Sequence, residues 1–271
     1  VNFTVLMSLY HKENPTYLRQ CLDSLVKQSL PAEEILIIKD GPLTEELDAI
    51  LDDFQKQYPK QTTIQAYPKN RGLGLALQDG VQLARNEWIA RMDTDDICRA
   101  DRFEKQINYL KEHPEVELLG SDVFEFDQSP KEPTARKVVP HSYQDILGYA
   151  KRRNPFNHMT VIYKKSAVLK AGNYQPLKGY EDYYLWVRML KNGVKAANLA
   201  DTLVYARADQ NMFKRRGGWD YFVDGSKAYQ KIYQVGLASP LDWLIRMGGQ
   251  AVFNLVPNSL RQNLYKKILR K

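Results

Sequence analysis

Residues 88–96 read WIARMDTDD, and this stretch decides how the rest of the chain is interpreted. Its apolar part, 88–92, has the length and composition of a short buried strand. The strand runs directly into Asp93, Thr94 and Asp95. Two carboxylates that flank one residue can reach a single hard cation, and magnesium or manganese prefers such oxygen ligands. Aspartate pairs are also common in solvated turns and helix caps, so the pattern gains weight only from its surroundings.

The residues before this stretch alternate between apolar, β-rich runs and amphipathic segments. Asn14 followed by Pro15 indicates a helix start, because asparagine caps helices and proline fits their first turn. We expect strands at 3–10, 35–39, 62–67 and 88–92, and helices at 15–26, 45–54 and 73–85. This alternation predicts an α/β fold, in which helices cover both faces of a mostly parallel, Rossmann-like sheet.

Polar residues stand at three of the expected strand ends. Ser8 and Tyr10 end the first strand, Asp40 follows the second, and Asp93 to Asp96 follow the fourth. In sheets of this kind, ligands bind beyond the carboxyl ends of the strands, near the point where the strand order reverses. The sequence therefore predicts a polar, nucleotide-type site at this edge.

The pattern after residue 101 is less regular. Residues 129–140 contain three prolines and several charges, which predicts an exposed connection. We expect strands near 117–126, 160–163 and 202–205, and helices near 143–152 and 182–190. The domain organisation predicted from this is a catalytic domain over 1–218, with a nucleotide-binding half (1–100) and an acceptor-binding half (101–218), and a helical extension over 219–271.

The composition is that of a globular protein, with 271 residues of which 44% are hydrophobic. The net charge is +7, and residues 236–271 hold +5 of it. That concentration, with no recognised binding motif, disfavours a nucleic-acid-binding module. Cys21 and Cys98 do not suggest a disulfide framework, and Cys21 is expected to be buried on a helix. Because neither a secretory signal nor a membrane-spanning run is recognised, the expected location is the cytoplasm.

The motifs, taken in order, resemble those of family 2 glycosyltransferases with the GT-A fold. They are the run at 3–10, Asp40 before Gly41, Asn-Arg-Gly at 70–72 and Asp-Thr-Asp-Asp at 93–96. The resemblance covers roughly residues 2–216, and the ordered set is far more specific than any one motif. Two later segments, 179–186 and 212–218, are similar to those of bacterial enzymes that build capsule or O-antigen repeat units.

The resemblance implies a nucleotide diphosphate sugar as donor, with UDP as the nucleotide. Ser8 and Tyr10 would line the pocket for the base and ribose, and Asp40 would contact the nucleobase. Arg71 would reach the donor. Each residue also has a simpler interpretation: Tyr10 as a core aromatic, Asp40 as a turn residue and Arg71 as a surface arginine beside a glycine turn.

The resemblance also implies a divalent metal, manganese or magnesium. Asp93 would contact the ribose or the donor sugar, and Asp95 would bind the metal. Asp96 would either support the site or cap the segment before Arg99. The metal would offset the charge that builds on a departing diphosphate.

Glu181 and Asp182 supply the other half of the implied mechanism. An acceptor hydroxyl must lose its proton as it attacks the anomeric carbon, and a carboxylate within hydrogen-bond reach can take it. The resemblance assigns that role to Asp182, with inversion at the anomeric carbon, and leaves Glu181 to orient the acceptor. The alternative is that both acids only complement the dipole at a helix start. A carboxylate pair also occurs in glycoside hydrolases, which need no such metal-type aspartates.

Three further residues belong to later motifs. Arg215 and Arg216 lie in a basic, glycine-containing loop that could close over the donor diphosphate, and a solvated charge run is the alternative. His158, in the Asn-Pro-Phe-Asn-His segment at 154–158, would contact acceptor or phosphate, and a structural histidine is the alternative.

The carboxyl-terminal segment is basic and amphipathic. Leu260, Leu264 and Ile268 recur every four residues beside basic positions. Such a stretch can lie on an anionic membrane, which fits a lipid-linked acceptor at the inner face of the cell membrane. The alternative is a helix packed on the catalytic domain or in a dimer.

A sugar nucleotidyltransferase is the remaining alternative among enzyme classes. Such an enzyme would require a glycine-rich, basic loop after the first strand, where this chain has His-Lys-Glu-Asn-Pro.

Overall fold

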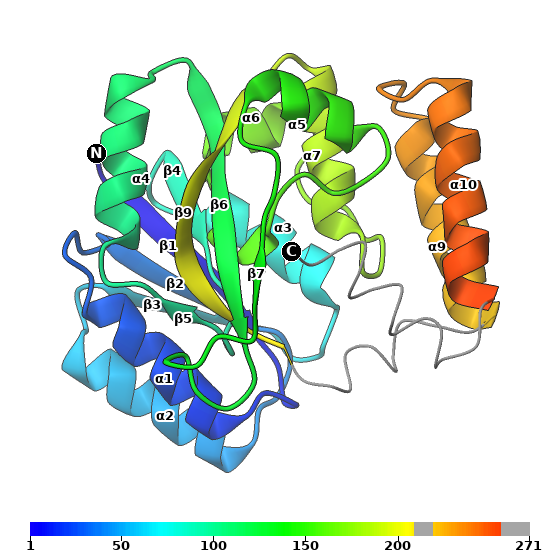
Figure 1. Cartoon of the computed structure of the whole chain (residues 1–271). Helices are drawn as coiled ribbons and strands as arrows, with labels where there is room; N and C mark the ends of the chain where they lie inside the picture. The colour runs from blue at the N-terminus through cyan, green and yellow to red at the C-terminus, as the bar shows by residue number, and fades with distance from the viewer. Residues whose placement is uncertain (209–218, 256–271) are drawn as a thin grey trace.

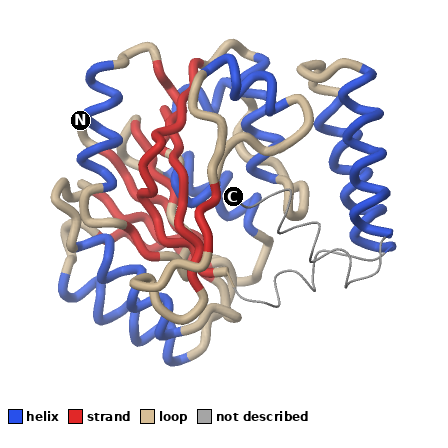
Figure 2. Tube along the Cα trace, viewed as in Figure 1, coloured by secondary structure: helices blue, strands red, loops and turns tan. Residues whose placement is uncertain are grey.

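The computed structural model describes residues 1–208 and 219–255, which form one sheet flanked by helices (Figures 1 and 2). The strands are β1 Phe3–Leu9, β2 Glu34–Lys39, β3 Thr62–Ala66, β4 Trp88–Arg91, β5 Ile97–Cys98, β6 Val116–Phe126, β7 Ala135–Lys137, β8 Ile162–Lys164 and β9 Lys195–Arg207. The helices are α1 Pro15–Val26, α2 Glu45–Gln57, α3 Leu73–Leu83, α4 Arg102–Glu112, α5 Tyr143–Ala150, α6 Lys165–Lys170, α7 Glu181–Lys191, α9 Trp219–Tyr233 and α10 Pro240–Leu255, with a 3-10 turn, η1, at His158–Thr160.

The strand order is β3-β2-β1-β4-β8-β6-β9-β5, and β7 pairs with β6. β1 to β4 pair in parallel, and so do the long strands β6 and β9. β8 is antiparallel to both β4 and β6, and the short β5 and β7 are also antiparallel to their partners. The longer ladders are therefore parallel, as predicted, and the second half of the sheet is mixed.

The strand order reverses between β1 and β4. The chain places β2 and β3 on one side of β1 and then returns to add β4 on the other side. Leu6 of β1 lies beside Arg91 of β4, so the carboxyl ends of the two strands are neighbours. This is the position at which ligands bind in sheets of this type. The fold thus brings the predicted strand-end residues to one edge.

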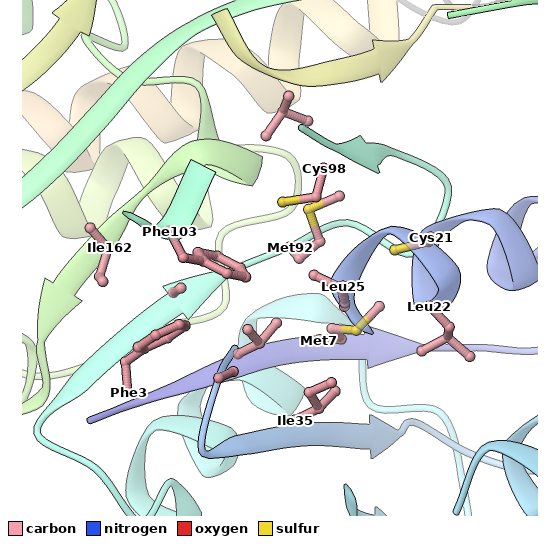
Figure 3. Close-up of a cluster of buried hydrophobic side chains, with 14 of the residues drawn as sticks. Phe3, Met7, Cys21, Leu22, Leu25, Ile35, Met92, Cys98, Phe103 and Ile162 are labelled. Carbon is pink, nitrogen blue, oxygen red and sulfur yellow. The ribbon is translucent and has the colours of Figure 1, made fainter. Parts of the chain in front are cut away.

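Helices pack on both faces of the sheet because successive side chains of a strand point to opposite faces. Met7 of β1 joins a core cluster with α1, α2 and α4, whereas Leu6 joins another with α3, α6 and α7. Figure 3 shows the first cluster, which includes Cys21 and Cys98. Both cysteines are free and buried, as expected for Cys21.

Two short strands were not predicted. β7 lies within 129–140, where only an exposed connection was expected, and β5 follows directly after the acidic turn. Each has three residues or fewer, so neither is long enough to show a periodic pattern. β7 pairs with β6 and β5 pairs with β9, and tertiary contacts decide both pairings. The predicted cap is confirmed, since the Asn14 side chain accepts a hydrogen bond from the backbone of Thr16 at 2.9 Å.

The carboxyl-terminal extension is helical over its described part. α9 and α10 lie side by side next to α7 (Figure 1), and the Arg152 guanidinium donates to Asp242 at the start of α10 at 2.7 Å. The predicted amphipathic stretch around Leu260 to Ile268 lies outside the described residues. Within 1–208 and 219–255, no helix combines the length and the apolar character needed to cross a membrane.

Candidate active site

An acidic turn, Asp93 to Asp96, follows β4 beside the end of β1. Arg91, two residues before it, has a side chain only 2% exposed and forms an ion pair with Asp93. A buried guanidinium keeps its charge and therefore needs a partner. The Arg91 guanidinium thus holds the Asp93 carboxylate, the first of the turn, at the end of β4.

The other carboxylates of the turn are crowded. Burial, with the charges of Asp93 and Glu13, raises the pKa of Asp95 to about 7. Burial, with the charges of Asp95 and Asp93, raises the pKa of Asp96 well above its usual value. Acids so close together resist full ionisation unless a cation joins them. The electrostatics of the turn therefore fit a bound divalent cation.

Asp96 gives a second indication of that fit. Its Oδ1 atom accepts a hydrogen bond from the Arg207 backbone at 2.8 Å, while its Oδ2 atom is buried without a hydrogen-bond partner. Over 1–208 and 219–255, no three histidine, cysteine or acidic side chains are grouped as a complete metal site. A cation at the turn would therefore take further oxygen ligands from elsewhere, and magnesium commonly takes them from substrate phosphates and water.

Arg207 reaches the turn from β9, in the other half of the sheet. Its Nε atom donates to the Asp95 carbonyl at 3.1 Å, and its guanidinium stacks on the Tyr17 ring at 3.6 Å. The hydrogen bond from the Arg207 backbone to Asp96 also ties the turn to β9. The contact is compatible with the supporting position considered for Asp96, which stays a prediction.

Ser8 and Tyr10 lie at the carboxyl end of β1, next to the acidic turn. Ser8 is partly buried, whereas Tyr10 is 42% exposed. Tyr10 is therefore not a core aromatic, and that alternative is wrong. Both side chains are placed where a base or ribose could be contacted, which stays a prediction.

Asp40, directly after β2, is hydrogen-bonded to the loop between β3 and α3. It is 2% exposed, and its two carboxylate oxygens accept the backbone N–H groups of Arg71 at 2.8 Å and Gly72 at 2.9 Å. The Arg71 guanidinium pairs with Asp79 of α3 and stacks on the Tyr67 ring at 3.8 Å. Arg71 is thus held by α3 rather than free in solvent. Contacts of Asp40 and Arg71 with a donor remain predictions.

Glu181 and Asp182 begin α7, as predicted, and both are partly buried. Asp182 accepts a hydrogen bond from the Asn154 side chain at 2.6 Å. Burial raises the pKa of Asp182, and the Tyr183 backbone, Asn154 and the charge of Arg91 act against that rise. Burial, with the charge of Asp182, also raises the pKa of Glu181. A desolvated carboxylate with such support can accept a proton from a hydroxyl.

Arg91 is shared by the two acidic groups. The Arg91 guanidinium is ion-paired with Asp93, and its charge opposes the rise in the pKa of Asp95 and Asp96 on the turn and of Asp182 on α7. One buried cation thus acts on two acidic groups, the turn and the Glu-Asp pair, that are far apart in the sequence.

His158 is the first residue of η1. Its Nε2 atom is 3.0 Å from the Tyr174 hydroxyl, and its ring is 6.0 Å from the Trp186 ring. Burial, helped by the charge of Arg91, lowers the pKa of His158 well below its usual value. A neutral histidine packed among aromatic residues favours the structural alternative over a contact with phosphate.

Three residues of the site were not predicted. Arg91 carried a usable signal, because a charged residue inside an apolar strand is buried only when it has a partner. Asn154 opens a quoted segment, but nothing local indicates its contact. Arg207 bonds to a residue 111 positions away, which no local pattern shows. The predicted Arg215 and Arg216 lie outside the described residues.

Known proteins are similar to this chain in sequence and in fold. A family model described as "Glycosyl transferase family 2" matches residues 4–171, which include the acidic turn but not Asp182. The amylovoran biosynthesis glycosyltransferase AmsE of Erwinia amylovora is 43% identical over 98% of each chain. An Escherichia coli enzyme, the UDP-Gal:alpha-D-GlcNAc-diphosphoundecaprenol beta-1,3-galactosyltransferase, is 36% identical over 99% of this chain and 97% of its own.

A solved structure shares the fold. The mannosyltransferase PcManGT of Pyrobaculum calidifontis, in complex with GDP-Man and Mn2+, superposes with a TM-score of 0.66 at 15% identity. The match covers 97% of this chain and 72% of that one. The architecture of sheet and helices described above is therefore also found in a protein that holds a nucleotide sugar and a metal.

Proposed function

Because the chain belongs to glycosyl transferase family 2, with the GT-A fold, and is a glycosyltransferase of polysaccharide biosynthesis, we propose that it is a metal-dependent, inverting enzyme that uses a UDP-sugar. The acceptor we propose is a hydroxyl of a lipid-linked glycan. One observation carries the proposal: the buried Arg91, which is ion-paired with Asp93 in the acidic turn, also acts through its charge on Asp182. The proposed donor site and the proposed proton acceptor thus share one buried cation.

The donor and acceptor classes are supported by the Escherichia coli relative, whose name specifies UDP-Gal and a diphosphoundecaprenol-linked sugar. We place the nucleotide at Ser8, Tyr10 and Asp40, at the ends of β1 and β2. Arg71 follows on the adjoining loop. Ser8 and Tyr10 lie at the end of β1, at the switch point of the strand order where nucleotides bind in such sheets, and Asp40 follows the neighbouring β2.

Asp95 would hold the divalent cation, with Asp93 directed to the ribose or donor sugar. When bound, a cation of this kind offsets the negative charge that develops on a leaving diphosphate. Asp96 and Arg207 keep the turn in place through the hydrogen bond between them at 2.8 Å. The burial and the neighbouring acids that raise the pKa of Asp95 to about 7 support this assignment.

Asp182 is the proposed base. The acceptor oxygen forms a bond to the anomeric carbon as the bond from that carbon to the diphosphate breaks. The hydroxyl proton passes to the Asp182 carboxylate, and the bonding electron pair leaves with the diphosphate. Attack from the face opposite the leaving group converts an α-linked donor into a β-linked product. Glu181, beside it at the start of α7, is proposed to orient the acceptor.

We also propose contact with an anionic membrane surface. Leu241, Leu244 and Ile245 of α10 are 63%, 59% and 45% exposed, and their spacing places them on one helix face. Exposed apolar side chains of this kind insert into the boundary of a bilayer. Replacing all three by serine should abolish flotation with anionic vesicles and leave turnover on a soluble acceptor unchanged. If the variant changes only the oligomeric state, the face is a subunit contact.

The proposed reaction is tested by screening UDP-sugars against a synthetic GlcNAc-diphospholipid, with manganese or magnesium, and determining the anomeric configuration of the product. Asp182→Asn should still bind donor and lose transfer by about 100-fold or more. Asp95→Ala should weaken metal-supported donor binding. Asp23→Asn, on the exposed face of α1, is the matched control. Wild-type transfer by Asp182→Asn would refute the base assignment, and an α-linked product from an α-linked donor would refute inversion.

A further inference from the structure

We propose that Asn154 is a positioning residue for Asp182, whose carboxylate it holds in the orientation that takes the acceptor proton. The inference rests on the proposed role of Asp182 as base. Asn154 lies in the loop between α5 and η1, and its Nδ2 atom donates to Asp182 Oδ2 at 2.6 Å. Neither the family match, which ends at residue 171, nor the sequence motif assigns this contact.

The orientation of the Asn154 amide follows from its other partner. Asn154 Oδ1 accepts a hydrogen bond from the Phe156 backbone nitrogen at 3.2 Å. A backbone nitrogen can only donate, so the amide oxygen must face Phe156 and the amide nitrogen must face Asp182. The contact is therefore a donor presented to a carboxylate, which is the stronger, charge-assisted kind of hydrogen bond.

The loop that carries Asn154 is fixed to the same helix as its target. The Phe156 ring is 2% exposed and meets the Trp186 ring edge-on at 5.8 Å. Trp186 lies four residues after Asp182 on α7, so the two side chains share one helix face. Asn157 adds a hydrogen bond to the backbone of β6 at 2.9 Å. The position of the donor is thus set by core packing rather than by Asp182 itself.

The hydrogen bond also favours the ionised form of Asp182. Burial raises the pKa of Asp182, and donation from Asn154 lowers it. Losing that donation would raise the pKa, so at a given pH fewer enzyme molecules would hold the base in its ionised form. The activity should then fall away at a higher pH on the acid side. The other charged or titratable groups that act on Asp182 are Glu181, Arg91, Lys137 and Tyr174.

The test uses two variants of the full-length enzyme. Asn154→Asp keeps the size and the acceptor for Phe156 but replaces the donor by a second carboxylate, and Asn154→Ala removes the side chain. Both should lower kcat at pH 7 by about tenfold or more, because a charge-assisted hydrogen bond is lost. Both should move the acid limb of the kcat profile to higher pH, with the larger movement for Asn154→Asp. The KM for the UDP-sugar should not change.

Asn108→Asp, on the exposed face of α4, makes the same chemical change away from the site and should behave as wild type. A merely structural role for Asn154 would lower the melting temperature and leave the pH profile where it is. If Asp182→Asn is inactive but both Asn154 variants keep the wild-type kcat and acid limb, this inference is wrong and the base assignment stands. If Asp182→Asn transfers normally, the base assignment itself has failed.

Discussion

The two halves of the sheet hold their polar residues in different ways. In the first half, residues 1–100, Asp40 is fixed by the backbone of Arg71 and Gly72, which belong to neighbouring strand-helix units. In the second half, residues 101–208, Asp182 is fixed by Asn154 from a separate loop. Arg207 reaches back from β9 to the acidic turn, across 111 positions of the chain.

The difference predicts which steps of the proposed reaction depend on which contacts. The proposed nucleotide-binding side is built from the loops after β2 and β3, so a change there should alter donor affinity alone. The proposed proton-accepting side needs the loop of Asn154 to meet α7, while β9 supports the acidic turn through Arg207 and the charge of Arg91 acts on both sides. Variants of residues that bridge the halves should therefore lower activity and stability more than variants confined to one half.

The largest effect is expected from Arg91→Met, because both acidic groups lose a cation. Asp93 loses its ion pair, and Asp182 loses a charge that favours its ionised form. We expect kcat to fall by about 100-fold or more. The free energy of unfolding should fall by about 2 kcal/mol, which is less than for a fully buried pair because Asp93 is partly exposed. Steady-state kinetics and urea denaturation measure these changes.

Arg91→Lys should recover part of the loss, since it restores the charge without the planar guanidinium. Arg19→Met, on the exposed face of α1, is the matched control. If Arg91→Met raises only the KM for donor and leaves kcat unchanged, the two acidic groups are not served by one cation.

Arg207→Gln removes the side-chain link between the halves and keeps the backbone bond to Asp96. It loses the hydrogen bond to the Asp95 carbonyl and the stacking on Tyr17. A stability loss of about 1–2 kcal/mol is expected from these two contacts. Metal-supported donor binding should weaken by about tenfold, as titration calorimetry with UDP and manganese would show. Unchanged binding would mean that β9 does not hold the acidic turn in its working position.

The sequence predicts the elements of the first half of the sheet more closely than the contacts of the second half. The strands and helices up to Arg91 were predicted to within a few residues, because each shows its own periodicity and its own start signal, such as Asn14 before Pro15. β5 and β7 were missed, since β5 has only two residues and the three residues of β7 lie in a stretch rich in proline and charge. Asp182 was predicted at a helix start through a resemblance. Its partner Asn154 was not, because the contact between them exists only after the chain has folded.

A smaller effect, confined to the first half, is expected from Asp40→Asn. Both oxygens of Asp40 accept hydrogen bonds from backbone N–H groups. In an asparagine, an NH2 group replaces one of these oxygens, so two donors would face each other. That mismatch costs about 1–2 kcal/mol of stability. The KM for the UDP-sugar should rise by about tenfold, with kcat nearly unchanged. The control Asp53→Asn, on the exposed face of α2, should change neither the stability nor the KM. A fall in kcat without a change in KM would contradict the division between the halves.

The smallest effect is expected outside both halves, at Asp242, which joins α10 to the catalytic domain. Hydrogen bonds from Ser239 and the contact with Arg152 lower the pKa of Asp242 to about 2 from 3.8. Because the folded protein binds this proton less readily than the unfolded chain, the stabilisation is complete above pH 3.8 and is lost as the pH falls toward 2.

Asp242→Asn should therefore lower the free energy of unfolding by roughly 1 kcal/mol near pH 6, because the hydrogen bonds from Ser239 and Arg152 lose their charged acceptor. The difference from wild type should shrink as the pH approaches 2, which thermal unfolding between pH 6 and pH 2.5 would follow. Transfer to a soluble acceptor at pH 7 should be unchanged, because α10 makes no described contact with the acidic turn or Asp182. Lost transfer in a variant that remains folded would show that the α9–α10 pair belongs to the acceptor site.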